Sequence, residues 1–432
     1  MKQKFVLFSF IICFLFIHSF TYSQEVSRLV RKLKFFPEIT EVIPVPKDST
    51  YSEAYEIMFE QPVDHNNPDG PKFKQRIFLS FKNEDSPVVF ITEGYSARRN
   101  YKSELASLLD ANQIIVEHRY FGKSVPEEKD WQYLNIKQAA DDHHAITNVF
   151  KKVFRGKWIS TGISKGGQTT LFYKRFYPDD IDVAVPYVAP VNLAQEDPRI
   201  YTFFSSVGTE ECREKILAFQ REFLLRRDEI MPIMVKEIAD KNLHMAFDND
   251  FLYDYMTLEY QFSFWQWGGK CEEIPEQDAP AEKLYKHMIS VSGFDFFTKE
   301  AMDEFGPFYV QAYNEIGYYG YDTFPFKDLL KEIKNFSNAF LVPQNAKINF
   351  NPNVMKDVNE WLQNNGNNIL YIYGGNDAWS STSMQLTGKT NAVKMVKEGG
   401  SHGTRIRDFE NGQKELIYST LENWLGVIID RR

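Results

Sequence analysis

The chain has 432 residues, of which 43% are hydrophobic, 16% aromatic and 25% charged, and its formal net charge is −9. This balance is typical of a globular protein and argues against a disordered chain. The negative charge and the lack of a basic run argue against a nucleic-acid partner, because such a partner needs clustered Lys and Arg to neutralise its phosphates.

The first 23 residues have the pattern of an export signal. Lys2 and Lys4 precede an apolar run from Phe5 to Ile17, and a polar stretch that ends near Ser23 follows. The run is too short to span a bilayer comfortably, so we expect a cleaved signal peptide, residues 1–23, rather than a retained membrane anchor. We therefore expect a periplasmic or extracellular protein with no stable membrane association after the signal is removed.

Two cysteines remain once that segment is removed, Cys212 and Cys271. In an oxidising compartment they could form one disulfide. The alternative is two unrelated buried thiols, because two cysteines in so long a chain are not a disulfide framework. No Cys-x-x-Cys or His/Cys cluster indicates a metal site, and we expect neither a metal nor an organic cofactor.

Short apolar runs alternate with helical stretches between residues 53 and 187. The predicted strands are Ile77–Phe81, Val88–Ile91, Gln113–Glu117, Trp158–Thr161 and Val183–Val188, with a helix at Ile136–Phe154. Such alternation is typical of β-α-β units and predicts a mostly parallel sheet.

The pattern changes after Pro190 to a long, charged and helical stretch. The α/β pattern then resumes near residue 346. The predicted elements are the helices Glu211–Ile230 and Tyr253–Trp267 in the helical stretch, then the helix Asn353–Asn364, the strands Ile369–Tyr373 and Ala392–Val396, and the helix Gln413–Leu425. We expect an α/β core in two parts, residues 24–191 and 346–432, interrupted by a helical cap insertion, residues 192–345.

The clearest motif is a Gly-x-Ser-x-Gly sequence formed by Gly162, Ser164 and Gly166. An apolar strand, Trp158–Thr161, precedes it, and a helix, Gln168–Phe176, follows it. In the nucleophile elbow of α/β-hydrolases this motif makes a sharp strand-to-helix turn, and its glycines avoid collisions with neighbouring backbone. The strand and the helix therefore predict Ser164 as a nucleophile on an α/β-hydrolase fold.

A serine nucleophile needs a base and a carboxylate that orients the base. In this fold the chain order is Ser, acid, His, and the acid follows a late strand. Asp377 follows the predicted strand Ile369–Tyr373, and His402 follows Ala392–Val396, each on a Gly-rich loop. The spacing predicts Asp377 and His402 as the partners of Ser164, although an Asp in such a place is also a common turn residue.

An oxyanion hole takes one N–H from the residue after the nucleophile and a second from the loop after an early strand. The first residue is Lys165. The loop after Val88–Ile91 contains Gly94, which lets the backbone approach closely, and Tyr95, which we expect to be the second donor. The alternative is an ordinary turn.

Several runs of residues, in the same order along nearly the whole mature chain, resemble the secreted prolyl tri- and tetrapeptidyl aminopeptidases. These are serine peptidases distantly related to prolyl carboxypeptidase and dipeptidyl peptidase II. The runs are Gln61–His65, Gln75–Arg76, Thr92–Tyr95, Glu117–Ser124, Gly162–Gly167, Arg175–Asp182, Tyr187–Pro190, Tyr260–Trp267 and Asn376–Ser380.

This resemblance implies removal of a short N-terminal peptide by cleavage after proline, with short free-N-terminus peptides as the partners. It carries over Ser164, Asp377 and His402 as catalytic residues, the same three that the spacing predicts. One departure is Ala378, where relatives often have Pro, which affects the rigidity of the loop rather than the chemistry.

The implied specificity suggests further candidates for substrate binding. An aromatic slot suits a proline ring, and Trp265, Trp267 and Trp379 are candidate walls, with core packing as the alternative. A free ammonium is usually bound by a buried carboxylate, for which Glu93 is the first candidate and Glu259 the second.

Two other functions fit the same sequence. A carboxylester hydrolase or lipase would use the same Ser-Asp-His set, although its cap would be more apolar than this charged insertion. A non-catalytic binding protein on a hydrolase scaffold is the other alternative, and the complete set of catalytic residue types disfavours it.

Overall fold

A nine-stranded sheet forms the centre of the computed structural model, which describes residues 27–431. The strands are β1 (Ile39–Pro44), β2 (Glu53–Pro62), β3 (Lys72–Phe81), β4 (Val88–Thr92), β5 (Asn112–Val116), β6 (Trp158–Ile163), β7 (Val183–Tyr187), β8 (Leu370–Gly374) and β9 (Val393–Lys397). Their order is β1-β2-β3-β5-β4-β6-β7-β8-β9. The pairs from β5 to β9 are parallel, whereas β1, β2, β3 and β5 pair antiparallel. This is the mostly parallel sheet of an α/β-hydrolase fold.

Helices cover both faces of this sheet. The helices in chain order are α1 (Arg28–Leu33), α2 (Glu104–Leu108), α3 (Ile136–Phe150), α4 (Lys165–Phe176), α5 (Arg199–Phe204), α6 (Glu210–Leu225), α7 (Arg227–Asp240), α8 (Asn249–Trp267), α9 (Ala281–Val291), α10 (Lys299–Gln311), α11 (Pro352–Asn365) and α12 (Asn411–Leu425). Alternating strand residues separate the two faces: Phe90 belongs to an apolar cluster that includes residues of α3, α4 and α11, and Ile91 belongs to a second cluster that includes residues of α2 and α12. Both faces are therefore apolar, as parallel sheets require.

The N-terminal part of the sheet differs from the sequence prediction. The predicted strand Ile77–Phe81 is only the end of the ten-residue β3, and β1 and β2 were not predicted. In β1 the two consecutive exposed polar residues, Thr40 and Glu41, break the apolar alternation that signals a strand. These strands are recognisable only through their pairing, β2 with β3 and β1 with β2.

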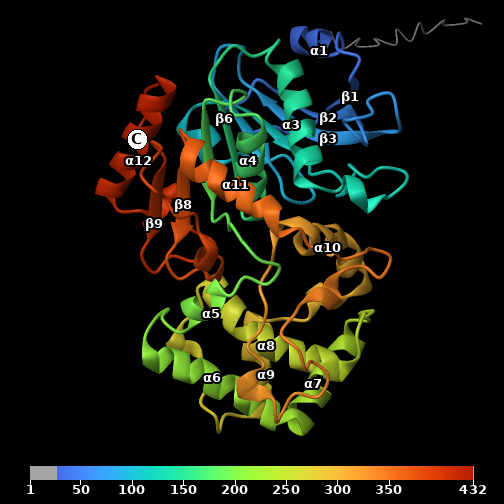
Figure 1. Ribbon diagram of the computed structural model, residues 1–432, viewed down its shortest axis with the longest axis vertical. Coiled ribbons are helices and arrows are strands. Elements are labelled where there is room, and N and C mark those ends of the chain that lie inside the picture. Colours follow the sequence, from blue (N-terminus) through green and yellow to red (C-terminus); the bar gives the residue numbers. More distant parts are fainter. Residues whose placement is uncertain (1–26, 432) are drawn as a thin grey trace, which may run out of the picture.

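Helices α5–α10, which we call the helical region, lie between β7 and β8 in the sequence. Figure 1 shows them below the half of the molecule that contains the sheet. The predicted helix Glu211–Ile230 is wrong as a single element, because it breaks at Arg226 into α6 and α7. Arg226 has φ −97° and ψ 25°, outside the helical range, and its guanidinium donates to the carbonyl of Ala279. The predicted domain boundaries, residues 192 and 345, stay a prediction.

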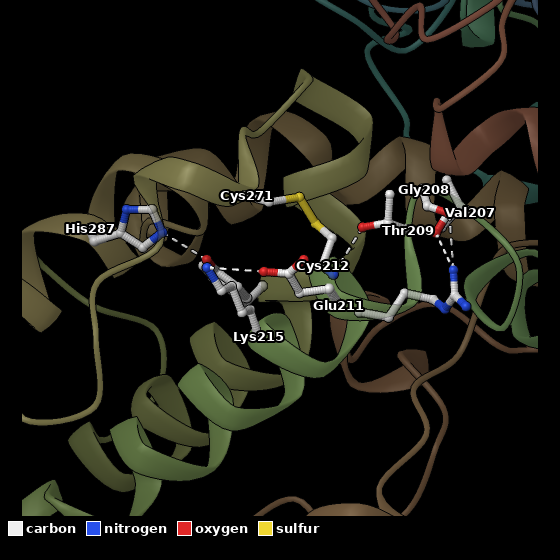
Figure 2. Close-up of a disulfide and its surroundings, with 10 residues drawn as sticks. Val207, Gly208, Thr209, Glu211, Cys212, Lys215, Cys271 and His287 are labelled. Atoms are coloured by element: carbon white, nitrogen blue, oxygen red, sulfur yellow. Dashed lines mark hydrogen bonds and ion pairs between the residues drawn. A yellow bond between two sulfur atoms is a disulfide. The ribbon is translucent and has the colours of Figure 1, made fainter.

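A disulfide joins Cys212 in α6 to Cys271 in the 3₁₀ turn after α8 (Figure 2). The Cα atoms of the two cysteines are 5.5 Å apart, and 59 positions separate them in the sequence. The bridge therefore encloses α7 and α8 in one loop of the helical region.

The predicted signal peptide, residues 1–23, lies outside the described residues. Within residues 27–431, no helix combines the length and the apolar character needed to cross a bilayer.

Candidate active site

Ser164 lies in the turn between β6 and α4 with an unusual backbone conformation, φ 56° and ψ −122°. A non-glycine residue at positive φ costs about 1–3 kcal/mol and persists only where its surroundings enforce it. The flanking glycines leave no room for a side chain: a Cβ on Gly162 would lie 2.2 Å from the Gly166 carbonyl oxygen, and one on Gly166 would lie 2.6 Å from the Thr92 carbonyl oxygen. The strand, the helix and these contacts thus force the serine into the strained turn.

Asp377 and His402 lie on the loops after β8 and β9, and His402 Nδ1 is 2.7 Å from Asp377 Oδ2. Asp377 is fully buried, and its other oxygen accepts a hydrogen bond from the Trp379 N–H at 3.1 Å. With Nδ1–H donating to the carboxylate, Nε2 of His402 is the basic nitrogen. Because β6, β7, β8 and β9 are successive parallel neighbours, all three predicted residues lie at the same edge of the sheet.

No hydrogen bond joins the Ser164 hydroxyl to His402 within the described part of the chain. The elbow is tied to β7 and β8 through the backbone instead: the Ser164 N–H donates to the Tyr187 carbonyl at 2.8 Å, and the Val188 N–H donates to the Ile372 carbonyl at 2.7 Å. In enzymes without substrate such catalytic hydrogen bonds are often long or poorly aligned.

The backbone N–H groups of Lys165 and Tyr95, predicted as oxyanion donors, have no hydrogen-bond acceptor among residues 27–431. Gly94 packs directly on the start of α4, since a Cβ there would lie 2.7 Å from the Gly166 nitrogen. The loop that carries Tyr95 is thus pressed against the turn that carries Ser164. Two free N–H groups beside a nucleophile can stabilise a developing negative charge.

The three candidate tryptophans have different surroundings. Trp379 is half-buried, and its ring lies 5.1 Å from Phe262 and 5.2 Å from Tyr319. Trp267 is 63% exposed, and its ring meets the His402 ring edge-on at 5.7 Å. Trp265 is buried instead in the helical region, where Phe264 and Gly208 pack against it.

Glu259 is buried in α8 and is surrounded by hydroxyl groups. It accepts hydrogen bonds from Tyr319 and Ser263 at 2.8 Å and from Tyr321 at 2.7 Å. Burial raises the pKa of its carboxyl, and these hydrogen bonds act in the opposite direction. Within residues 27–431 no Lys, Arg or His forms an ion pair with it. Glu259 is therefore a buried carboxylate without a cation.

Glu93 lies in a different environment, on the wall of a cavity of about 180 Å³ that also contains Tyr101, Arg405 and Arg407. The Tyr101 hydroxyl donates to Glu93 at 2.9 Å. Burial raises the pKa of Glu93, although that hydrogen bond opposes the shift. The two candidate carboxylates thus differ in their neighbours: hydroxyls and aromatic rings surround Glu259, and two arginines share the cavity of Glu93.

Sequence reasoning missed two features of this site. Tyr318 and Tyr319 pack against Trp379, and Tyr321 packs against Tyr319; the Gly317–Tyr321 run was a visible signal for this aromatic wall. The second feature has no sequence signal: the carbonyl of Gln266, near the end of α8, accepts the backbone N–H of His402 at 2.8 Å.

The chain is similar in sequence to known peptidases. The family model of the PS-10 peptidase S37 matches residues 37–431. The prolyl tri/tetrapeptidyl aminopeptidase of Streptomyces mobaraensis is 35% identical over 379 residues, which cover 85% of this chain and 79% of that protein. The lysosomal Pro-X carboxypeptidase of Mus musculus is 29% identical over 170 residues, 34% of each chain.

Among solved structures, the proline iminopeptidase of Mycobacterium smegmatis is similar at 12% sequence identity and a TM-score of 0.42, covering 85% of this chain and 98% of that one. This likeness is too weak to bear on function. The family match and the 35% identical relative both extend over most of the sequence. The chain belongs to the peptidase S37 family and is a serine peptidase on an α/β-hydrolase fold.

Proposed function

We propose that the protein is an exported exopeptidase that releases short peptides from free N-termini by cutting after proline, with Ser164, Asp377 and His402 as its catalytic residues. The observation that carries the catalytic assignment is the strained turn of Ser164, because such strain persists at sites where it serves a function. The hydrogen-bonded Asp377–His402 pair at the same sheet edge supports it. Cleavage after proline is supported by the similarity to a prolyl tri/tetrapeptidyl aminopeptidase.

The mechanism is acyl transfer through the serine. His402 Nε2 takes the Ser164 proton as the oxygen attacks the carbonyl carbon of the substrate proline. Asp377 stabilises the imidazolium, and the N–H groups of Lys165 and Tyr95 receive the oxyanion. His402 then gives its proton to the leaving amine as the C–N bond breaks, and a water molecule releases the peptide from the serine in the same way.

Aromatic side chains near the predicted catalytic residues are the groups that would contact the substrate proline. The Trp267 ring contacts the His402 ring, and Trp379 lies two residues after Asp377 in the sequence. The wall continues from Trp379 through Tyr318 to Phe308, which packs against Tyr95. A compact, rigid pyrrolidine ring buries well against such flat apolar faces.

Glu259 is the better candidate for binding the substrate ammonium. Burial raises the pKa of Glu259, and a substrate ammonium beside it would favour the ionised form and pair with it. The hydroxyl groups of Tyr319 and Tyr321 beside it are further polar groups near the bound ammonium. Glu93 shares its cavity with Arg405 and Arg407, whose positive charge would repel an ammonium.

The position of Glu259 on α8 also suggests how much peptide fits ahead of the cut. Glu259, Ser263 and Gln266 lie on one face of the helix, and the Gln266 carbonyl binds the His402 backbone. Seven residues of helix rise about 10 Å. Three extended residues also span about 10 Å, so a tripeptide is the first product length to test.

The test is a series of Xaa-Xaa-Pro-anilide substrates, free and N-acetylated, with Ala in place of Pro as a control. Acetylation should lower kcat/KM by a factor that corresponds to about 2–5 kcal/mol, because it leaves the carboxylate unpaired. Replacing Pro by Ala should cost about 1–3 kcal/mol of apolar contact. Equal rates for free and acetylated peptides would refute the amine anchor, and faster hydrolysis of a nitrophenyl ester than of any peptide would favour a carboxylester hydrolase.

Export is part of the proposal because the first 23 residues have the sequence pattern of a signal peptide. N-terminal sequencing of the mature protein should find a start near Gln24. A mature protein that begins with Met1 would contradict export through a cleaved signal.

A further inference from the structure

Lys165, the residue after the predicted nucleophile, has a buried side chain with a specific backbone partner. The side chain is 2% exposed, and its Nζ donates a hydrogen bond to the Gly94 carbonyl at 2.6 Å. The Nζ also lies over the rings of Tyr95 and Phe121, at 5.5 and 5.1 Å from their centroids. No carboxylate pairs with it within residues 27–431, and burial lowers the pKa of the ammonium well below its ordinary value. Burying an amine in this way is costly unless it serves the fold or the site.

The carbonyl that Lys165 binds belongs to the same peptide unit as the Tyr95 N–H. A peptide unit is planar and trans, so its C=O and N–H point in opposite directions. A contact that holds the Gly94 oxygen toward Lys165 therefore directs the Tyr95 N–H away from Lys165. The next peptide unit is held as well, because the Tyr95 carbonyl accepts the His118 N–H at 3.2 Å.

We propose that the Lys165 side chain is a positioning residue that holds the Tyr95 N–H in the orientation of an oxyanion donor. Lys165 thus acts twice: its backbone N–H is one donor, and its side chain orients the other. This inference rests on the proposed function, which assigns both N–H groups to the oxyanion. An orientation set in advance matters because preorganised donors need no rearrangement when the negative charge develops.

A purely structural role for Lys165 can be separated from this one, because α4 contains a matched second lysine. Lys174, near the other end of the helix, is 6% exposed, and its Nζ donates to the carbonyls of Pro178 and Ile181 at 2.7 and 2.9 Å. Burial also lowers the pKa of Lys174. The two lysines thus share a helix, burial and backbone acceptors, but only Lys165 binds the loop of Tyr95.

The experiment compares Lys165→Met with Lys174→Met in the full mature protein. The substrate is a Xaa-Xaa-Pro-anilide. Two inhibitors of matching sequence are compared: the peptide aldehyde forms a tetrahedral adduct with the serine, and the peptide alcohol does not. We expect Lys165→Met to lower kcat about 10- to 100-fold, less than the 10²–10³ that follows loss of a donor. KM and the affinity for the alcohol should change less than about threefold, and the affinity for the aldehyde should fall in parallel with kcat.

Lys174→Met should lower Tm by about as much as Lys165→Met does, because both remove a buried hydrogen-bonded side chain. It should leave kcat within about twofold, because the contacts of Lys174 are remote from the Tyr95 loop. Equal losses of aldehyde and alcohol affinity in Lys165→Met, or an unchanged kcat, would overturn the inference. If Lys165→Met does not fold, Lys165→Arg is the second variant: its larger, planar head cannot donate to the Gly94 carbonyl from the same position, so the affinity for the aldehyde should again fall more than that for the alcohol, and equal losses would overturn the inference. Full activity of a folded Ser164→Ala protein would instead refute the proposed function.

Discussion

Asp377 in the sheet half of the molecule and Glu259 in the helical region are both buried carboxylates, but they have different partners. Asp377 is paired with a histidine of the same fold, at 2.7 Å. Glu259 is held by hydroxyl groups, without a cation among residues 27–431. Under the proposed function, the substrate ammonium would supply the cationic partner that Glu259 lacks within the described part of the chain. The comparison suggests that the sheet edge performs the chemistry and the helical region selects the substrate.

The largest expected effect lies at the sheet edge. Ser164→Ala should lower kcat on the order of 10⁶ while the fold is retained, because it removes the nucleophile. Asp377→Asn should lower kcat roughly 10⁴-fold, because an amide holds the wrong tautomer of His402. Steady-state kinetics on a Xaa-Xaa-Pro-anilide and a circular dichroism spectrum check both variants. Near-normal turnover by a well-folded Ser164→Ala protein would contradict the catalytic assignment.

A smaller and more selective effect is expected in the helical region. Glu259→Gln should lower kcat/KM for free-amine peptides by a factor equivalent to about 2–5 kcal/mol, because the charge pair with the substrate is lost. Acetylated peptides should be affected little. Glu93→Gln is the matched control, since it neutralises the competing carboxylate. If the Glu93 variant showed the selective loss and the Glu259 variant did not, the ammonium would bind in the cavity of Glu93.

The smallest effect on turnover is expected from the disulfide of the helical region. Replacing Cys212 and Cys271 by Ser should lower the free energy of unfolding by about 2–4 kcal/mol, because the closed loop restricts the unfolded chain. A nitrophenyl ester should still be hydrolysed at nearly the normal rate, since the bridge lies in the helical region. Denaturant unfolding and ester kinetics measure the two effects. Alkylation of both thiols in the native protein without a reductant would show that the bridge is absent.

The contrast between the sheet edge and the helical region also explains how much of the site could be predicted from the sequence. The elbow at Ser164 and the loops of Asp377 and His402 each follow an apolar strand of a parallel sheet, so local patterns were enough to place them. The wall around Glu259 is assembled from α8 and the Gly317–Tyr321 segment, which lie far apart in the sequence and meet only in the folded chain. For the same reason Trp265 could not be distinguished from Trp379: both are aromatic, but only the packing against Gly208 shows that Trp265 is part of the core.

The separate roles proposed for the two regions, catalysis at the sheet edge and substrate selection by the helical region, can be tested with two variants and two substrates. The measurement is kcat/KM of Ser164→Ala and Glu259→Gln on a free Xaa-Xaa-Pro-anilide and on a nitrophenyl ester that has no amine. We predict that Ser164→Ala loses both activities, whereas Glu259→Gln loses the peptide and retains the ester. Equal losses on both substrates in Glu259→Gln, or an unchanged peptide rate, would contradict a separate role for the helical region.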